Sequence, residues 1–433
     1  MKKTFCFAVL VSGVAFADPT VEVSGTSWDD SINAVKVDYM VSGGPAVVTF
    51  SARTNGVAVS DVVVTRFTGD INRLVATGPH SFSWYPDAVW PRTTLSGGSL
   101  EVVLTAWATN APPPFMVIDL EVSDGVRYYA TKEAFPGGFG AKTYKTGQIV
   151  FRRIPAAGVT FNMGRTGDDA TYENYYFKNT EAQHQVRFTK DFYLAVYETT
   201  QAQHMHVCAV RKKRYPGLGA SVDAHPVESL SSYGTNYDPS KAVSSDNNGV
   251  VNVLRGTEYK WPADLHQVTA TSVIGQFREK TGVQVDLPTE SQWEYACRAG
   301  TDTVFYDGLA CPTNIAWATY NASSAYSYAF EPSGTQEVGL LRPNAWDLYD
   351  MCGNVAEVCL DVYEASPVYS SVEVDPAGTT TWSQAAVLRG GSWASRADWY
   401  SRSASRWSLS NGYFYSATKY VGYRLCAPAE AVK

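Results

Sequence analysis

The stretch Leu287-Pro288-Thr289-Glu290-Ser291-Gln292-Trp293-Glu294-Tyr295-Ala296 predicts a short helix with a well-defined start. Thr289 stands three residues before Gln292, which is the spacing of a capping box that satisfies two otherwise unpaired backbone amides. Trp293 then falls on the apolar face, and Gly300 can end the helix in a left-handed conformation. The stretch therefore fixes one helix in a region that otherwise carries few helical signals.

Two further helices are expected, one near 270–280 that ends before Gly282 and one after Thr199 or Thr200. The rest of this half is rich in Gly, Asn, Ser and Tyr, a composition typical of long irregular loops. The expected class is α+β with few helices.

The first 140 residues read differently, because short β-branched runs alternate with turn signals and show no helical period. Residues 21–23, 35–40 and 100–104 are such runs. We expect an N-terminal β-sandwich of immunoglobulin-like type over residues 18–140. Pro136-Gly137-Gly138-Phe139-Gly140 is the best candidate for a linker.

The N-terminus has the three parts of a secretory signal peptide. Lys2 and Lys3 precede an apolar run, and Ala15-Phe16-Ala17 supplies the cleavage site, so residues 1–17 are predicted to be removed. The apolar run is too short to span a membrane. We therefore expect a secreted, periplasmic or cell-surface protein.

The charge composition limits the classes of partner that the protein could bind. The formal net charge is -7 and Lys and Arg do not cluster, which argues against nucleic acid. Six cysteines remain after export, an even number that permits disulfides, although buried free thiols explain them equally well.

Seven motifs between Thr143 and Ala427, taken together, resemble the sulfatase-modifying-factor family that includes formylglycine-generating enzyme. In chain order they are Phe161-Asn162-Met163-Gly164, 192–203 (FYLAVYETTQAQ), His225-Pro226-Val227, 287–296 (LPTESQWEYA), 344–358 (NAWDLYDMCGNVAEV), 388–393 (LRGGSW) and Gly422-Tyr423-Arg424. The resemblance implies a domain over 143–428 with an irregular C-type-lectin-like fold.

The resemblance also implies two copper-binding cysteines just after the Gly-Gly-Ser motif. The matching positions hold Ser395 and Tyr400, and a hydroxyl and a phenol cannot replace the thiolates that Cu(I) requires. No copper and no catalytic residue are therefore expected. Among six histidines only His204 and His206 lie close in sequence, and on a helix they face different ways, so an iron site is unsupported.

Calcium is the ion that the resemblance favours. One family site carries over to the carbonyls of Cys352, Gly353 and Val355 and the carboxylate of Glu357, and a second begins at Asn314 and Ile315. The alternative for the glutamate is a buried carboxylate paired with backbone amides or an arginine.

The segment 394–420 is dominated by Tyr, Ser, Arg and Trp, as binding surfaces often are. In retroelement-diversified relatives of this family, the same stretch forms the ligand-binding surface. The candidate ligand-binding residues are Ser395, Arg396, Asp398, Trp399, Tyr400, Arg402, Trp407, Tyr413, Tyr415 and Tyr420. The alternative is that the aromatic residues pack in the core and that Arg402, Arg406 and Arg424 are ion-pair partners.

Two functions follow. The first is an exported binding protein that presents this surface to an extracellular protein or glycan. The second is a metal-dependent oxidative protein-maturation enzyme of the formylglycine-generating type. The missing cysteines favour the first, and two other thiols that converge beneath the surface would overturn it.

Overall fold

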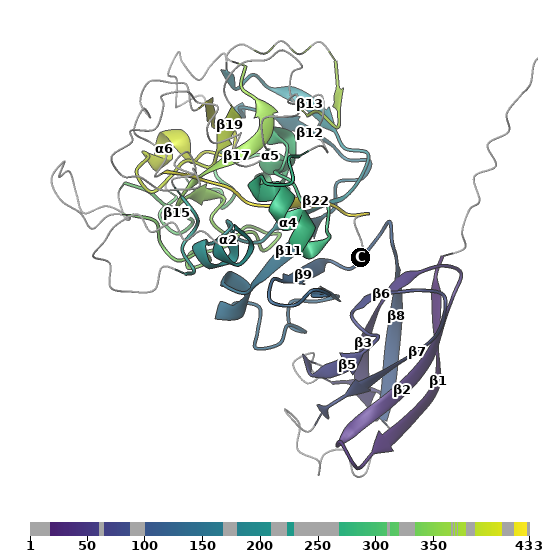
Figure 1. Ribbon diagram of the computed structural model, residues 1–433. Helices are drawn as coiled ribbons and strands as arrows, with labels where there is room; N and C mark the ends of the chain where they lie inside the picture. The colour runs from purple at the N-terminus through teal and green to yellow at the C-terminus, as the bar shows by residue number, and fades with distance from the viewer. Residues whose placement is uncertain are drawn as a thin grey trace, which may run out of the picture. The chain divides into compact units, whose positions relative to one another are not determined.

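The structure is a computed structural model in which residues 18–59, 65–86, 100–167, 180–208, 223–228, 268–309, 312–319, 334–364, 367, 369, 371–377, 386–408 and 420–430 are described. It forms two compact units that divide between Thr109 and Asn110 (Figure 1). The predicted signal peptide lies outside the described residues.

The first unit consists of two antiparallel sheets. One has the order β1 (Thr20–Asp29), β2 (Ala34–Ser42), β7 (Gly78–Trp84), β5 (Phe67–Gly69); in the other, β3 (Ala46–Thr54) lies between β4 (Val57–Ala58) and β6 (Arg73–Val75) and also pairs with β8 (Leu100–Ala108). Along β2 the side chains alternate between core and solvent, as expected for a strand with one covered face. Phe50 of one sheet and Phe82 of the other are neighbours in a shared core, with ring centroids 4.9 Å apart. The predicted strands are thus present, while the immunoglobulin-like topology stays a prediction.

The structure places the boundary between the units earlier than the predicted linker. Strands β9 (Phe115–Asp119) and β10 (Val126–Tyr129) pair with each other, and β9 pairs with β11 (Gln148–Ile154) of the second unit. The run Gly137-Gly138-Phe139-Gly140 follows Phe135, which is 1% exposed. The ring centroids of Phe135 and Phe115 lie 5.4 Å apart. The run forms turns inside the second unit, because the ring of Phe139 also packs against those of Phe135 and Phe115.

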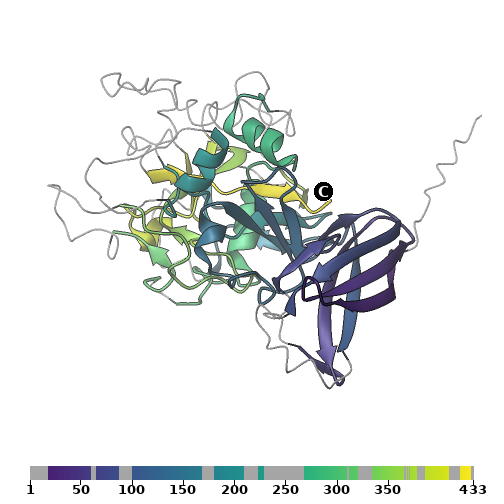
Figure 2. The ribbon, with the colours of Figure 1, turned by 60° about the horizontal axis from the view of Figure 1, so that its bottom comes forward.

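The second unit is built on several small sheets. The largest has the order β10, β9, β11, β14 (Phe192–Ala195), β22 (Cys426–Pro428), so the C-terminal strand lies beside a strand from the middle of the chain (Figure 2). The others are β12 (Thr160–Met163), β13 (His184–Arg187), β18 (Glu373–Val374); β15 (Ala316–Trp317), β16 (Cys352–Gly353); and β20 (Arg406–Ser408), β19 (Ala386–Arg389), β17 (Ala356–Val362), β21 (Val421–Gly422).

The helices confirm the three sequence predictions. In α5 (Glu290–Arg298) the Thr289 side chain accepts from the Gln292 amide, and the Gln292 side chain accepts from the Thr289 amide. The left-handed residue at its end is Ala299, one position before the glycine that was expected. The other helices are α2 (Gln201–Cys208), α4 (Val273–Thr281), the single turn α6 (Ala397–Tyr400) and a 3-10 turn at Lys142–Lys145. Within the described ranges, no helix has the length and apolar character needed to cross a membrane.

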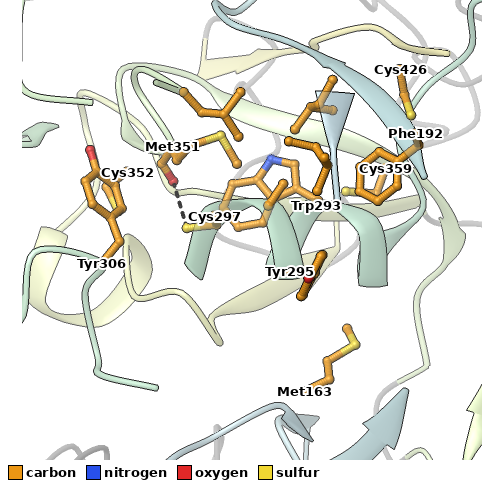
Figure 3. Packing of buried hydrophobic residues seen from close by; sticks show 14 of the residues in the cluster. Met163, Phe192, Trp293, Tyr295, Cys297, Tyr306, Met351, Cys352, Cys359 and Cys426 are labelled. Atoms are coloured by element: carbon orange, nitrogen blue, oxygen red, sulfur yellow. Dashed lines mark hydrogen bonds between the residues drawn. The ribbon is translucent and has the colours of Figure 1, made fainter. Parts of the chain in front are cut away.

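The core of the second unit surrounds Trp293 of α5, which is fully buried. Figure 3 shows Cys297, Tyr306, Met351 and Cys352 on one side of its indole and Phe192, Cys359 and Cys426 on the other. The helix that the capping box begins therefore supplies the central side chain of the domain.

Candidate functional site

Trp293, Glu357 and Arg424 come from three of the sequence motifs and meet in one fully buried contact. Arg424 donates from Nε to Oε2 of Glu357 at 2.7 Å and from Nη2 to Oε1 at 2.6 Å. The indole nitrogen of Trp293 donates to the same Oε2 at 2.7 Å. Both oxygens of the glutamate are thus occupied, and the alternative weighed for Glu357, a carboxylate paired with an arginine, is what the structure contains.

A second buried glutamate holds the turn beside this contact. Asn354 donates from Nδ2 to Oε2 of Glu198 at 2.7 Å, and the Val355 amide donates to Oε1 at 3.0 Å. Burial, then the nearby charges of Asp350 and Glu357, raise the pKa of Glu198 well above its usual range. These carboxylates serve internal donors, so the contact organises the turn and exposes no acid or base to solvent.

The glycine of the Gly353-Asn354 turn is required by a close backbone approach. Its φ is 89°, and a Cβ there would lie 2.3 Å from the carbonyl oxygen of Trp317, because β15 and β16 run side by side. The same pairing brings Asn314 and Ile315 next to the turn. The two predicted calcium segments are therefore neighbours.

The donor set of the first predicted calcium site does not fit an ion as it stands, because Arg424 already neutralises Glu357. At the second, Asn314 is exposed with its carbonyl accepting from the Arg342 amide at 3.0 Å, and Ile315 is buried. In the part of the chain that the structure describes, no three His, Cys, Asp or Glu side chains form a group suited to a metal. Calcium stays a prediction, and binding at Glu357 requires Arg424 to move.

Several candidate ligand-binding residues are internal, which corrects the prediction for them. Arg402 is 0% exposed and pairs with both oxygens of Glu181 at 2.8 Å. Ser395 is buried, and its hydroxyl lies 2.9 Å from that of Ser392. Trp407 is also buried. The arginine finds a carboxylate far away in sequence, and the serine ties its own turn together.

The other candidates reach the surface. Arg396 is exposed, and Trp399, Tyr400 and Tyr420 are half-buried. The Arg396 guanidinium lies 4.3 Å from the Trp399 ring, and the Tyr400 ring lies 3.7 Å from that of the buried Trp407. Tyr413 and Tyr415 lie outside the described residues, as does the side chain of Asp398. The described surface of the segment is therefore a small aromatic patch with one cation.

The sequence analysis weighed Arg406 as an ion-pair partner, but it named neither the carboxylate of that pair nor the second buried pair, which Arg389 forms. Arg406 pairs with Glu290 at 2.6 and 2.8 Å, and Arg389 pairs with Glu294. Burial alone would raise the pKa of Glu294, but Arg298 and Arg389 outweigh it and the pKa is lowered. The signal was available in part, because Glu290 and Glu294 stand four apart and so share one face of the predicted helix.

Two thiols also converge under the segment. Cys297 lies with its sulfur 3.9 Å from the Met351 carbonyl oxygen and 3.8 Å from the Ser403 hydroxyl, and it is hydrogen-bonded to Cys352. Both cysteines are 0% exposed (Figure 3). Burial raises the pKa of Cys352 well above its usual range, and the hydrogen bond to Cys297 raises it further. The described cysteines are all free thiols, and Cys311 lies outside the described residues.

Similar proteins share parts of this chain. The chaperone protein LppX of Paenibacillus barcinonensis is 26% identical over 190 residues, which are 39% of this chain and 61% of that protein. The formylglycine-generating enzyme of Thermomonospora curvata is 33% identical over 116 residues, 24% of this chain and 37% of the enzyme. The chain thus spans about three fifths or less of the length of these curated relatives. Among solved structures, Treponema denticola variable protein 1 is 23% identical with a TM-score of 0.45, covering 65% of this chain and 95% of that one.

The family assignment rests on a longer match. Residues 152–428 match the sulfatase-modifying factor enzyme 1-like domain, and all seven motifs lie within this range. The chain therefore belongs to the sulfatase-modifying factor enzyme 1-like family.

Proposed function

We propose that this chain is an exported binding protein, and that its family domain presents the aromatic patch of Arg396, Trp399 and Tyr400 to an extracellular protein or glycan. The observation that carries the proposal is that residues of the segment 394–420 divide into buried ion-pair partners and surface side chains. Arg402 and Arg406 form ion pairs with internal carboxylates. Arg396, Trp399 and Tyr400 remain at the surface. A rigidly held base with exposed aromatic side chains suits binding, because little side-chain entropy is lost on contact.

The chemistry at the family's copper positions supports a non-catalytic role. Ser395 is engaged with Ser392, and Tyr400 stacks against Trp407. Neither supplies the soft thiolate that a Cu(I) site needs, so this pair does not fit copper. The name of the Paenibacillus relative, a chaperone, is consistent with a family domain that binds other proteins.

The test is a binding screen of the full chain against soluble glycans and purified extracellular proteins. A ligand of the patch should lose at least about tenfold in affinity in Trp399→Ala and Tyr400→Ala, as expected for aromatic hot spots. Tyr85→Ala is the matched control, because Tyr85 is a half-buried aromatic residue of the first unit. Ligands that bind both patch variants as well as they bind the wild type would refute the proposal.

A second function has one specific observation in its favour, the Cys297 and Cys352 thiols. Paired sulfurs can hold Cu(I). These two lie in the same domain as Ser395 and Tyr400, which occupy the positions of the family's copper-binding cysteines. The convergence of the two thiols is the observation that counts against the binding function, but both sulfurs are fully buried and a substrate would need a path through the core to reach them. We therefore place the oxidative enzyme second.

A copper competition assay separates the two functions. Full-length protein is mixed with Cu(I) and a chromophoric chelator, and copper transfer is followed by absorbance. The binding proposal expects no transfer. Uptake of copper that is lost in Cys297→Ser and kept in Cys208→Ser would favour the enzyme, since Cys208 is a half-buried thiol remote in sequence from the pair.

A further inference from the structure

A cavity of about 250 Å³ opens beside the first turn of α5, away from the aromatic patch residues. Strands β13, β17, β18 and β20 also contribute to its wall. The side chains that matter for its chemistry are His184, Glu290, Asp361, Tyr369, Glu373 and Arg406. Its volume is below the range of about 300–1,000 Å³ that is usual for drug-sized ligands, so an occupant must be small.

Asp361 is a buried carboxylate with spare hydrogen-bonding capacity. It is 5% exposed, and its Oδ2 accepts from the Glu290 amide at 2.5 Å. The Glu290 amide is the donor to this carboxylate within the described residues, and a carboxylate can accept more than one hydrogen bond. Because Asp361 lines the cavity, a donor that entered there could bond to it.

The cations around the cavity are already engaged. Arg406 forms a two-pronged pair with Glu290 and donates its remaining nitrogen to the carbonyl oxygens of Thr180 and Glu364. His184 is 3.3 Å from Glu373. Within the described part of the chain, Asp361 is therefore left as the buried carboxylate of this wall without a cation of its own.

Two stacked aromatic rings also line the cavity. The His184 and Tyr369 rings stack with centroids 3.5 Å apart and an interplanar angle of 9°. The face of a tyrosine ring attracts an ammonium group, and its apolar surface accommodates methylene groups. A carboxylate and an aromatic ring that line one small cavity are groups suited to an alkylammonium.

We propose that this cavity binds a primary ammonium group on a short aliphatic chain, with Asp361 as the counter-ion and Tyr369 as the wall for the chain. A bare metal ion fits less well, because no group of three metal-ligating side chains is present in the described residues. The ammonium can come from a lysine side chain of a partner protein or from a free small amine. The site does not depend on the patch proposed above.

Burial and the charge of Glu290 raise the pKa of Asp361 to about 8, so its ionised form is disfavoured when no cation is beside it. A bound ammonium would compensate both effects. The experiment is therefore run at about pH 8.5, where a primary amine is still protonated.

Calorimetric titration of the full chain uses three probes: n-butylammonium, Nα-acetyl-lysine methylamide and its Nε-acetylated, uncharged analogue. We expect both amines to bind and the uncharged analogue not to. Binding of the lysine derivative alone supports the cavity and identifies a peptide as the source. Binding of the uncharged analogue as tight as that of the amine, or binding of neither amine, overturns the proposal.

Two variants locate the site. Asp361→Asn keeps the acceptor for the Glu290 amide and should weaken amine binding at least about tenfold, the loss expected for a buried charge pair. Tyr369→Leu removes the ring and should weaken it several-fold, which keeps the proposal testable if the aspartate variant folds poorly. Glu430→Gln changes the net charge equally at an exposed position and should leave binding unchanged. Equal affinity in wild type and both cavity variants would exclude this site.

Discussion

Arg424 and Glu357 are joined by two hydrogen bonds of 2.7 and 2.6 Å, although the two residues stand far apart in sequence and neither is exposed. The arginine also donates to the carbonyl oxygens of Ala195 and Tyr349. One side chain thus ties the last motif to β14, to β17 and to the loop between them.

Removing one partner of this pair should be severely destabilising. Arg424→Ala leaves a buried carboxylate without a counter-charge, and we expect it to lower the free energy of unfolding by about 3–5 kcal/mol. Lys190→Ala is the matched control, because Lys190 and Glu430 form an exposed pair at 3.0 Å that should contribute under about 1 kcal/mol. Urea denaturation of both variants checks this, and equal losses would contradict it.

Two glycines with nearly the same backbone angle should respond differently to alanine. Gly353 has φ 89° and Gly300 has φ 92°, but only the first meets another backbone, that of Trp317. Gly300→Ala should cost about 1–2 kcal/mol for the left-handed conformation alone. Gly353→Ala should cost a further ~1–3 kcal/mol, because the chain must move to admit the methyl group. Comparable unfolding midpoints for the two variants would show that β15 and β16 are not in contact.

Asp361 should make stability fall with rising pH. Its pKa in the folded protein is about 8, above the ordinary value of 3.8, so the folded state holds the proton more tightly than the unfolded state. The stabilising contribution of the protonated group is complete below the ordinary pKa and is lost as pH rises through about 8. Asp361→Asn should therefore gain stability relative to wild type between acidic and mildly alkaline pH. Parallel stability curves for the two proteins would argue against a buried, protonated carboxyl group.

Calcium should not change the thermal stability of the protein through the first predicted site, that of Glu357. Because Glu357 already serves Arg424 and Trp293, we expect millimolar Ca²⁺ and its chelation to give the same midpoint of thermal unfolding. A rise in that midpoint that disappears in Glu357→Gln would mean that the ion displaces the arginine, and it would favour the sequence-based prediction.

Local sequence signals predicted the helices and strands of this fold. The pairing of strands that lie far apart in sequence could not be predicted from them. The capping box at Thr289 and Gln292 depends on neighbouring residues alone and is present as expected. Whether a strand at 115–119 joins the earlier or the later sheet depends on its partner β11, which strand propensity does not reveal. A fragment that begins after Gly140 would therefore lack two strands of the largest sheet.

The site was harder to predict for the same reason. Arg402 and Arg396 are the same residue type in one short segment, yet one is fully buried and the other exposed. The difference arises from Glu181, which lies outside the motifs. The thiol pair was missed because Cys297 lies in the last turn of α5 and Cys352 lies in the distant strand β16, and no spacing rule links them.

The internal pairing of Arg402 with Glu181 has an evolutionary consequence. Fold stability in this segment resides in residues that face inward, whereas Arg396 and Trp399 contribute mainly to the outer surface. Substitutions at separated sites with different partners act nearly independently on stability. A lineage can therefore exchange the outward side chains for new specificities while the inherited scaffold stays intact.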